Sequence, residues 1–136
     1  MQRWHFSLKL TNSLPRPTDA ELAILTVLWE KGPSTVRDIH EATTERGTGY
    51  TTVLKMLQIM NDKGLVSRQD TNKAHVYTAA QSRQKSQRNL IADLADRAFG
   101  GSSTILIQQA LAAKPATSEE LAEIRRMIDE MEAKNG

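Results

Sequence analysis

The order of hydrophobic patterns between Thr18 and Thr78 constrains the fold more than any other feature of the chain. Three segments with helical periodicity come first, and two short runs of β-compatible residues follow them. Apolar residues recur every three to four positions on the buried face of a helix, whereas they alternate along a half-buried strand. The order therefore predicts a mainly α-helical domain that ends in a small β-hairpin.

Capping residues and helix breakers indicate where the first helix lies. Thr18 and Glu21 have the spacing of a capping box, in which each side chain accepts a hydrogen bond from the other residue's backbone N–H. We therefore expect this helix to begin at Thr18 and to end at Gly32-Pro33. The second helix is predicted to begin after Ser34 or Thr35, and its end is expected near glycines 47 and 49.

The third helix is predicted from about Tyr50 to Lys63, with Gly64 as the residue that ends it. Its buried stripe consists of Val53, Met56, Leu57 and Met60. At 100° per residue the opposite face carries Thr51, Lys55, Gln58 and Asp62, with Thr52 on its flank. This helix is therefore held by an apolar face and presents a polar face outward.

The two β-compatible runs are Leu65–Gln69 and Ala74–Thr78, and residues 70–73 between them supply turn chemistry. Three helices followed by such a hairpin are typical of a winged helix-turn-helix domain. In this fold the third helix enters the major groove of DNA and the hairpin, or wing, contacts the backbone. The sequence thus predicts a DNA-binding domain.

Polar side chains on these elements have the chemistry that DNA contact requires. Thr51 and Thr52 can reach a phosphate or a base edge, Lys55 a guanine or a phosphate, and Gln58 an adenine. Arg68 and Lys73 near the hairpin tip suit phosphate contact, as does Arg37 on the second helix. His75 either contacts DNA from the wing or fills a strand position. Asp62 argues against DNA contact at the end of the third helix.

The residues from Gln81 onward predict three more helices, separated by Gly100-Gly101 and Lys114-Pro115. Because three short amphipathic helices make a poor core alone, we expect them to pair two copies of the chain. The expected organisation is a flexible arm (1–14), the winged domain (15–80) and a dimerisation segment (81–136). The apolar residues assigned to dimerisation are Leu90, Leu94, Phe99, Ile105, Leu121, Ile124, Ile128 and Met131.

The composition excludes several other classes of protein. The chain has no cysteine, so disulfides and thiolate metal sites are excluded, and the three histidines are not spaced as a zinc site. No motif of a nucleotide-binding or hydrolytic enzyme occurs, so we expect neither catalysis nor a cofactor nor a metal. No apolar run is long enough to span a bilayer, and a cytoplasmic protein is expected. Trp29 and Tyr77 are interpreted as core residues rather than as an aromatic ligand box.

Several stretches of the chain resemble the BlaI/MecI/CopY family of penicillinase-repressor regulators, over about residues 14–134. They are Thr18-Asp19-Ala20-Glu21 with Leu28-Trp29, Thr35-Val36-Arg37-Asp38-Ile39, Tyr50-Thr51-Thr52-Val53 with Lys63-Gly64-Leu65, and Ala74-His75-Val76-Tyr77. The resemblance implies a homodimer that binds a pseudo-palindromic operator and represses transcription. It also implies a DNA contact at Tyr50 and dimerisation through the tail.

The chain departs from this family in two places. The copper-responsive branch has Cys-x-Cys motifs near the C-terminus, and this chain lacks them. The β-lactam-responsive branch is cleaved in a Gly-Gly-Phe-Asn-like segment, and here Gly100-Gly101-Ser102-Ser103 keeps only the glycines. The resemblance therefore implies, through a partial match, a cleavage region at Gly101, Ser102 and Ser103. It also implies a membrane-bound sensor-peptidase that acts upstream. The alternative function is a winged-helix protein-interaction module that does not bind DNA.

Overall fold

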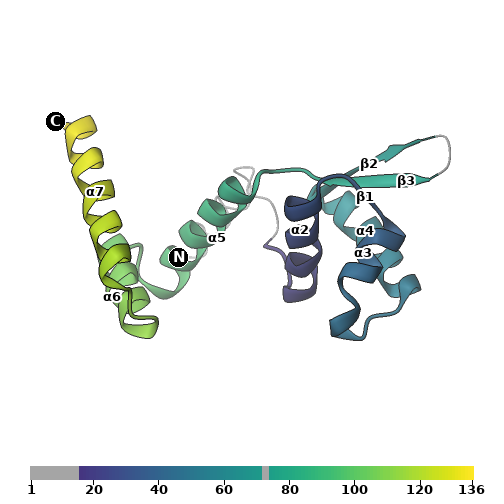
Figure 1. The fold of residues 1–136 in the computed structure, drawn as a ribbon, viewed down its shortest axis with the longest axis horizontal. Coiled ribbons are helices and arrows are strands. Elements are labelled where there is room, and N and C mark those ends of the chain that lie inside the picture. The colour runs from purple at the N-terminus through teal and green to yellow at the C-terminus, as the bar shows by residue number, and fades with distance from the viewer. Residues whose placement is uncertain (1–15, 72–73) are drawn as a thin grey trace, which may run out of the picture. The chain divides into compact units, whose positions relative to one another are not determined.

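The computed structural model describes residues 16–71 and 74–136. The expected flexible arm at 1–14 and the predicted contact residue Lys73 lie outside the described residues. The chain divides into two compact units after Leu90, and each unit is described by itself. The helices and strands appear in Figure 1. Their bounds are α2 (Asp19–Lys31), β1 (Ser34–Thr35), α3 (Val36–Ala42), η1 (Thr44–Arg46), α4 (Tyr50–Lys63), β2 (Val66–Asp70), β3 (His75–Ala79), α5 (Arg83–Ala98), α6 (Ser103–Ala113) and α7 (Ser118–Asn135).

Reciprocal capping boxes fix the starts of α2 and α3. At α2 the Glu21 N–H donates to Thr18 Oγ1 at 3.1 Å, and the Thr18 N–H donates to Glu21 Oε1 at 3.0 Å. Thr35 and Asp38 form the same pair at α3, with both distances 3.1 Å. These bonds satisfy backbone donors that the first turn of a helix leaves without partners. Both helices therefore begin where the sequence predicts.

The second helix ends earlier than the sequence predicts. Helix α3 stops at Ala42, and the buried Thr43 hydroxyl donates back to the Ile39 carbonyl at 2.8 Å. A short 3-10 turn, η1, then follows and ends at Gly47, whose φ of 72° is left-handed. Such threonine bonds to the backbone compete with continuation of the α-helix. Helix α4, by contrast, spans the predicted residues 50–63 and ends at Gly64 with φ 85°.

The sheet has three antiparallel strands in the order β1-β3-β2. Strands β2 and β3 each begin and end one residue later than predicted. In Figure 1 the hairpin that they form projects beyond the helices. Strand β1 was not predicted, because its two residues pair with Tyr77 and Val76, more than forty positions away. It connects the middle of β3 to the start of α3.

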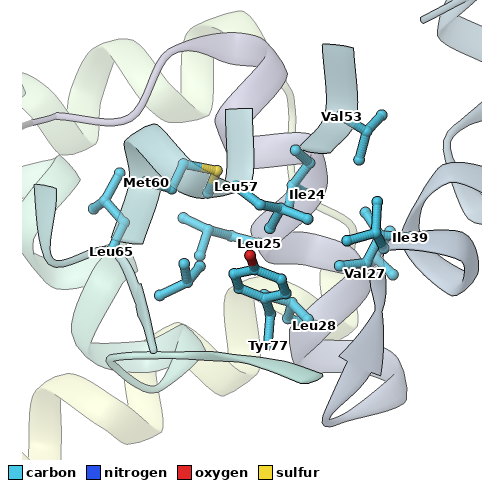
Figure 2. Close-up of a cluster of buried hydrophobic side chains, with 12 residues drawn as sticks. Ile24, Leu25, Val27, Leu28, Ile39, Val53, Leu57, Met60, Leu65 and Tyr77 are labelled. Atoms are coloured by element: carbon cyan, nitrogen blue, oxygen red, sulfur yellow. The ribbon is translucent and has the colours of Figure 1, made fainter. Parts of the chain in front are cut away.

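The hydrophobic core of the first unit joins α2, α3, α4 and the hairpin. Ile39, Leu57 and Met60 are fully buried, and Figure 2 shows the Tyr77 ring among the side chains of α2 and α4. Trp29 packs against this cluster, and its indole N–H donates to the Gln81 carbonyl at 3.0 Å. The interpretation of Trp29 and Tyr77 as core residues is therefore confirmed. Ile24 is a further core residue that the sequence pattern did not single out.

The second unit consists of the end of α5, α6 and α7. None of residues 91–136 is buried, and six of their large apolar side chains are at least 45% exposed: Ile91, Leu94, Ile105, Ile107, Ile128 and Met131. Ser102 and Thr117 cap α6 and α7. In the described part of the chain no helix is both long and apolar enough to cross a membrane.

Candidate nucleic-acid interface

Helix α4 presents a mainly polar face outward, on which Ile59 is an exposed apolar side chain (42% exposed). Val53, Leu57 and Met60 are buried on one side. The predicted contact residues on the other side are all exposed: Thr51, Thr52, Lys55 and Gln58. Asp62 is also exposed, at the C-terminal end of this face. The structure therefore brings the predicted groove residues together on one exposed helix face.

Tyr50 begins α4 and lies against α3. Its ring meets the His40 ring edge-on, with centroids 5.8 Å apart and planes at 79°. Such T-shaped pairs are favourable, because the positive edge of one ring faces the negative face of the other. Tyr50 stays 47% exposed, so this contact fixes the ring position and leaves its surface open. This places Tyr50 beside the polar face that Thr51 and Thr52 begin.

An ion pair attaches the other end of α4 to α2. Lys63 Nζ lies 2.8 Å from Glu21 Oε2, and the Glu21 side chain is only 7% exposed. Burial by itself raises the pKa of the Glu21 carboxyl, but hydrogen bonds from Lys63 and Thr18 outweigh it, and the pKa lies below its ordinary value. The carboxylate therefore remains charged and holds the last turn of α4 against the first turn of α2.

The wing carries a second charged cluster at its outer end. Asp70 Oδ1 lies 2.6 Å from His75 Nδ1 and 3.3 Å from Arg68 Nε. Asp70 and His75 are directly paired across the hairpin, and Arg68 is two residues earlier on the same face of β2. Side-chain exposures of 42% for Arg68, 58% for Asp70 and 52% for His75 leave the cluster open to solvent. His75 is thus an exposed strand residue with an acidic partner.

The remaining predicted residues differ in placement. Arg37 is exposed on α3. All eight predicted dimerisation residues are exposed or half-buried, so the chain by itself gives none of them a closed core. Gly100 and Gly101 form the α5–α6 turn with φ of 58° and 79°, and both are exposed. Ser102 accepts a hydrogen bond from the Ile105 N–H at 3.1 Å and so caps α6.

Three residues of the site were not singled out as partners by the sequence pattern: Glu21, Lys63 and Asp70. Glu21 was recognised only as a capping residue, and Asp70 only as turn chemistry. Glu21 and Lys63 lie 42 positions apart, and Asp70 and His75 lie on different strands, so local periodicity carries no signal for these two pairs. Among residues 16–71 and 74–136, no group of three or more His, Asp or Glu side chains is placed to hold a metal ion.

The fold and the α4 face together define a winged helix-turn-helix regulator with a helical extension. A model of the penicillinase repressor family matches residues 17–130. The transcriptional regulator BlaI from two Mycobacterium tuberculosis strains, CDC 1551 / Oshkosh and ATCC 25618 / H37Rv, is 33% identical over 126 residues, which cover 90% of each chain. The chain therefore belongs to the penicillinase repressor family and is a transcriptional regulator, as the sequence resemblance predicts.

Solved structures give a more distant likeness. A probable transcriptional regulator from Pseudomonas aeruginosa has a TM-score of 0.48 and 16% identity, and the match covers 95% of this chain and 89% of that one. A transcriptional regulator from Thermotoga maritima also has a TM-score of 0.48, with 14% identity and coverage of 97% and 88%.

Proposed function

We propose that this protein is a homodimeric repressor that binds a pseudo-palindromic operator in double-stranded DNA. The observation that carries the proposal is the exposed polar face of α4, held outward by Val53, Leu57 and Met60 on the buried side. Thr51, Thr52, Lys55 and Gln58 contact bases or phosphates in the major groove, and Tyr50 borders them. Arg37, Arg68 and Lys73 are the proposed backbone contacts.

The exposed apolar side chains of the tail support the dimer. A unit of three helices without a buried side chain lacks the core that a stable fold requires. Pairing of two tails removes this apolar surface from water and places two copies of α4 on one duplex. In such dimers the recognition helices are about 34–36 Å apart, which is one helical turn of DNA. The site is then an inverted repeat with that spacing.

Release from DNA is proposed to follow proteolysis at the α5–α6 turn. Gly101 is an exposed turn residue, Ser102 caps α6, and the exposed Ser103 is the first residue of α6. Exposed loops of small residues are favoured sites of cleavage. A cut here separates α6 and α7 from the DNA-binding unit and removes most of the apolar surface used for pairing. The proposed upstream partner is a membrane-bound sensor-peptidase, while the regulator itself acts in the cytoplasm.

A gel-shift series tests the DNA-binding role of α4. The probe is the DNA upstream of the protein's own gene, compared with a shuffled duplex of equal length at two salt concentrations. Lys55→Ala is expected to lower specific affinity by about 5- to 150-fold, since a base contact contributes about 1–3 kcal/mol. Lys85→Ala, an exposed lysine on α5, is the matched control and should change binding little.

If Lys55→Ala and Lys85→Ala lower the affinity for the probe equally, the result contradicts the placement of α4 in the DNA interface. A wild-type protein that does not bind either duplex at low salt, yet forms a dimer, would instead favour the interaction-module function.

A further inference from the structure

We propose that Asp70 competes with DNA phosphates for Arg68 and His75, and so limits the sequence-independent affinity of the wing. The inference rests on the proposed function, because it assigns a specificity-determining role within the DNA interface. Asp70 is a carboxylate on the wing. The other charged residues in the described part of the wing, Arg68 and His75, suit contact with a polyanion.

One carboxylate oxygen of Asp70 is hydrogen-bonded to His75 and forms an ion pair with Arg68. An ionised carboxylate can only accept hydrogen bonds, so His75 must carry its proton on Nδ1 to bond Asp70 Oδ1 at 2.6 Å. Arg68 Nε lies 3.3 Å from the same oxygen. Arg68 and Asp70 carry opposite charges, which offset one another at this end of the wing. A phosphate that approaches Arg68 therefore meets a neighbouring negative charge instead of a free cation.

The backbone keeps this cluster in place at the end of the hairpin. Asp70 is the last residue of β2 and His75 is the first residue of β3, and the two are paired in register. The Thr71 hydroxyl and the Thr71 N–H both donate to the Ala74 carbonyl, at 2.9 Å each. The turn is thus closed directly beyond the pair. The hydrogen bond to His75 helps to hold the Asp70 carboxylate beside Arg68.

Exposure makes exchange with a phosphate accessible. The three side chains are between 42% and 58% exposed, so a DNA strand can reach them without rearrangement of the core. Exposed ion pairs are weak, because water and salt screen them. A phosphate can therefore replace Asp70, but each such contact loses the energy of the intramolecular pair. The expected result is a wing that contributes little until α4 has placed it on DNA.

The test measures binding to a random-sequence duplex, because this affinity depends on phosphates and not on an operator. Asp70→Asn removes the charge and keeps an oxygen that can accept from His75. We expect its affinity to rise about two- to fivefold for each wing that contacts DNA. The slope of log K against log salt should steepen by about 0.9 for each additional phosphate contact.

A double-mutant cycle separates competition for Arg68 from a general effect of charge. Arg68→Ala should reduce affinity only slightly in the wild-type background and several-fold more in the Asp70→Asn background. Asp129→Asn, which changes an exposed carboxylate on α7, is the control for loss of one negative charge. Circular dichroism checks that every variant is folded.

Two results would overturn the proposal. The first is equal tightening by Asp70→Asn and Asp129→Asn without coupling to Arg68. The second is weaker binding by Asp70→Asn, which indicates that Asp70 orients Arg68. The same variants are eluted from a heparin column with salt, where later elution of Asp70→Asn that depends on Arg68 is expected. Failure of the wild type to bind any duplex would refute the proposed function, whereas heparin elution would still decide the role of Asp70.

Discussion

Replacing Lys63 with methionine removes the cation that compensates the buried charge of Glu21. The Glu21 side chain is 7% exposed and the Lys63 side chain 32%, so the pair is shielded from water on the Glu21 side. A hydrogen bond to a charged group contributes about 1.5–3 kcal/mol, and partial access of water to Lys63 places this one in the lower part of that range. We expect Lys63→Met to lower the free energy of unfolding by about 2 kcal/mol at pH 7.

The pH dependence of this loss follows from the pKa of Glu21. In the wild type the pKa lies below its ordinary value of 4.5, so the stabilisation is complete above pH 4.5 and is lost as the pH falls through the depressed pKa. Without Lys63 the effect of burial is offset less, so the pKa of Glu21 rises. Protonation of Glu21 then lowers the free energy of unfolding of the variant less than that of the wild type. The difference in stability should therefore shrink as the pH falls below about 4.5.

Urea denaturation at pH 7 and at pH 4 measures both effects, at one protein concentration because the stability of a dimer depends on concentration. Lys55→Met is the control, since Lys55 is on the exposed face of the same helix. It should change the free energy of unfolding by no more than about 0.5 kcal/mol. The reasoning fails if Lys63→Met costs no more than Lys55→Met at pH 7, or if its cost is the same at both pH values.

Three further predictions follow from the packing, the caps and the tail. Leu57→Ala leaves a cavity in the core and should lower the free energy of unfolding by about 2–5 kcal/mol in urea titration, and a change below 1 kcal/mol would contradict its central position. Thr35→Ala removes the cap of α3 and should cost about 0.5–2 kcal/mol, with Thr104→Ala on exposed α6 as the control. Ile128→Asp places a charge on the apolar face of α7, so sedimentation should show a larger monomer fraction than for Glu132→Asp, and equal fractions would exclude Ile128 from the interface.

The elements with strong local signals could be predicted from the sequence. Helix α4 has the predicted bounds because its buried stripe, Gly64 and its polar face all lie within one segment. The start of α2 follows from Thr18 and Glu21, which interact three residues apart. Helix periodicity also places Lys55 on the outer face, since angular position depends only on spacing along the helix.

Features that depend on contacts between distant segments could not be predicted. Strand β1 has only two residues, and it exists because the hairpin offers Tyr77 and Val76 as partners. Glu21 and Lys63 are 42 positions apart, so their pairing requires the packing of α2 against α4 to be known. The charge sharing at Asp70 depends on the hairpin register, and a shift of one residue would place it on the opposite face from His75.

Sedimentation of the protein with a fluorescent duplex that carries its operator tests the central claim most directly. The account predicts two chains bound per duplex, on an inverted repeat whose half-sites are about one helical turn apart, with binding that weakens steeply as salt increases. One chain per duplex, or a dimer that binds operator and shuffled DNA equally at physiological salt, would contradict it.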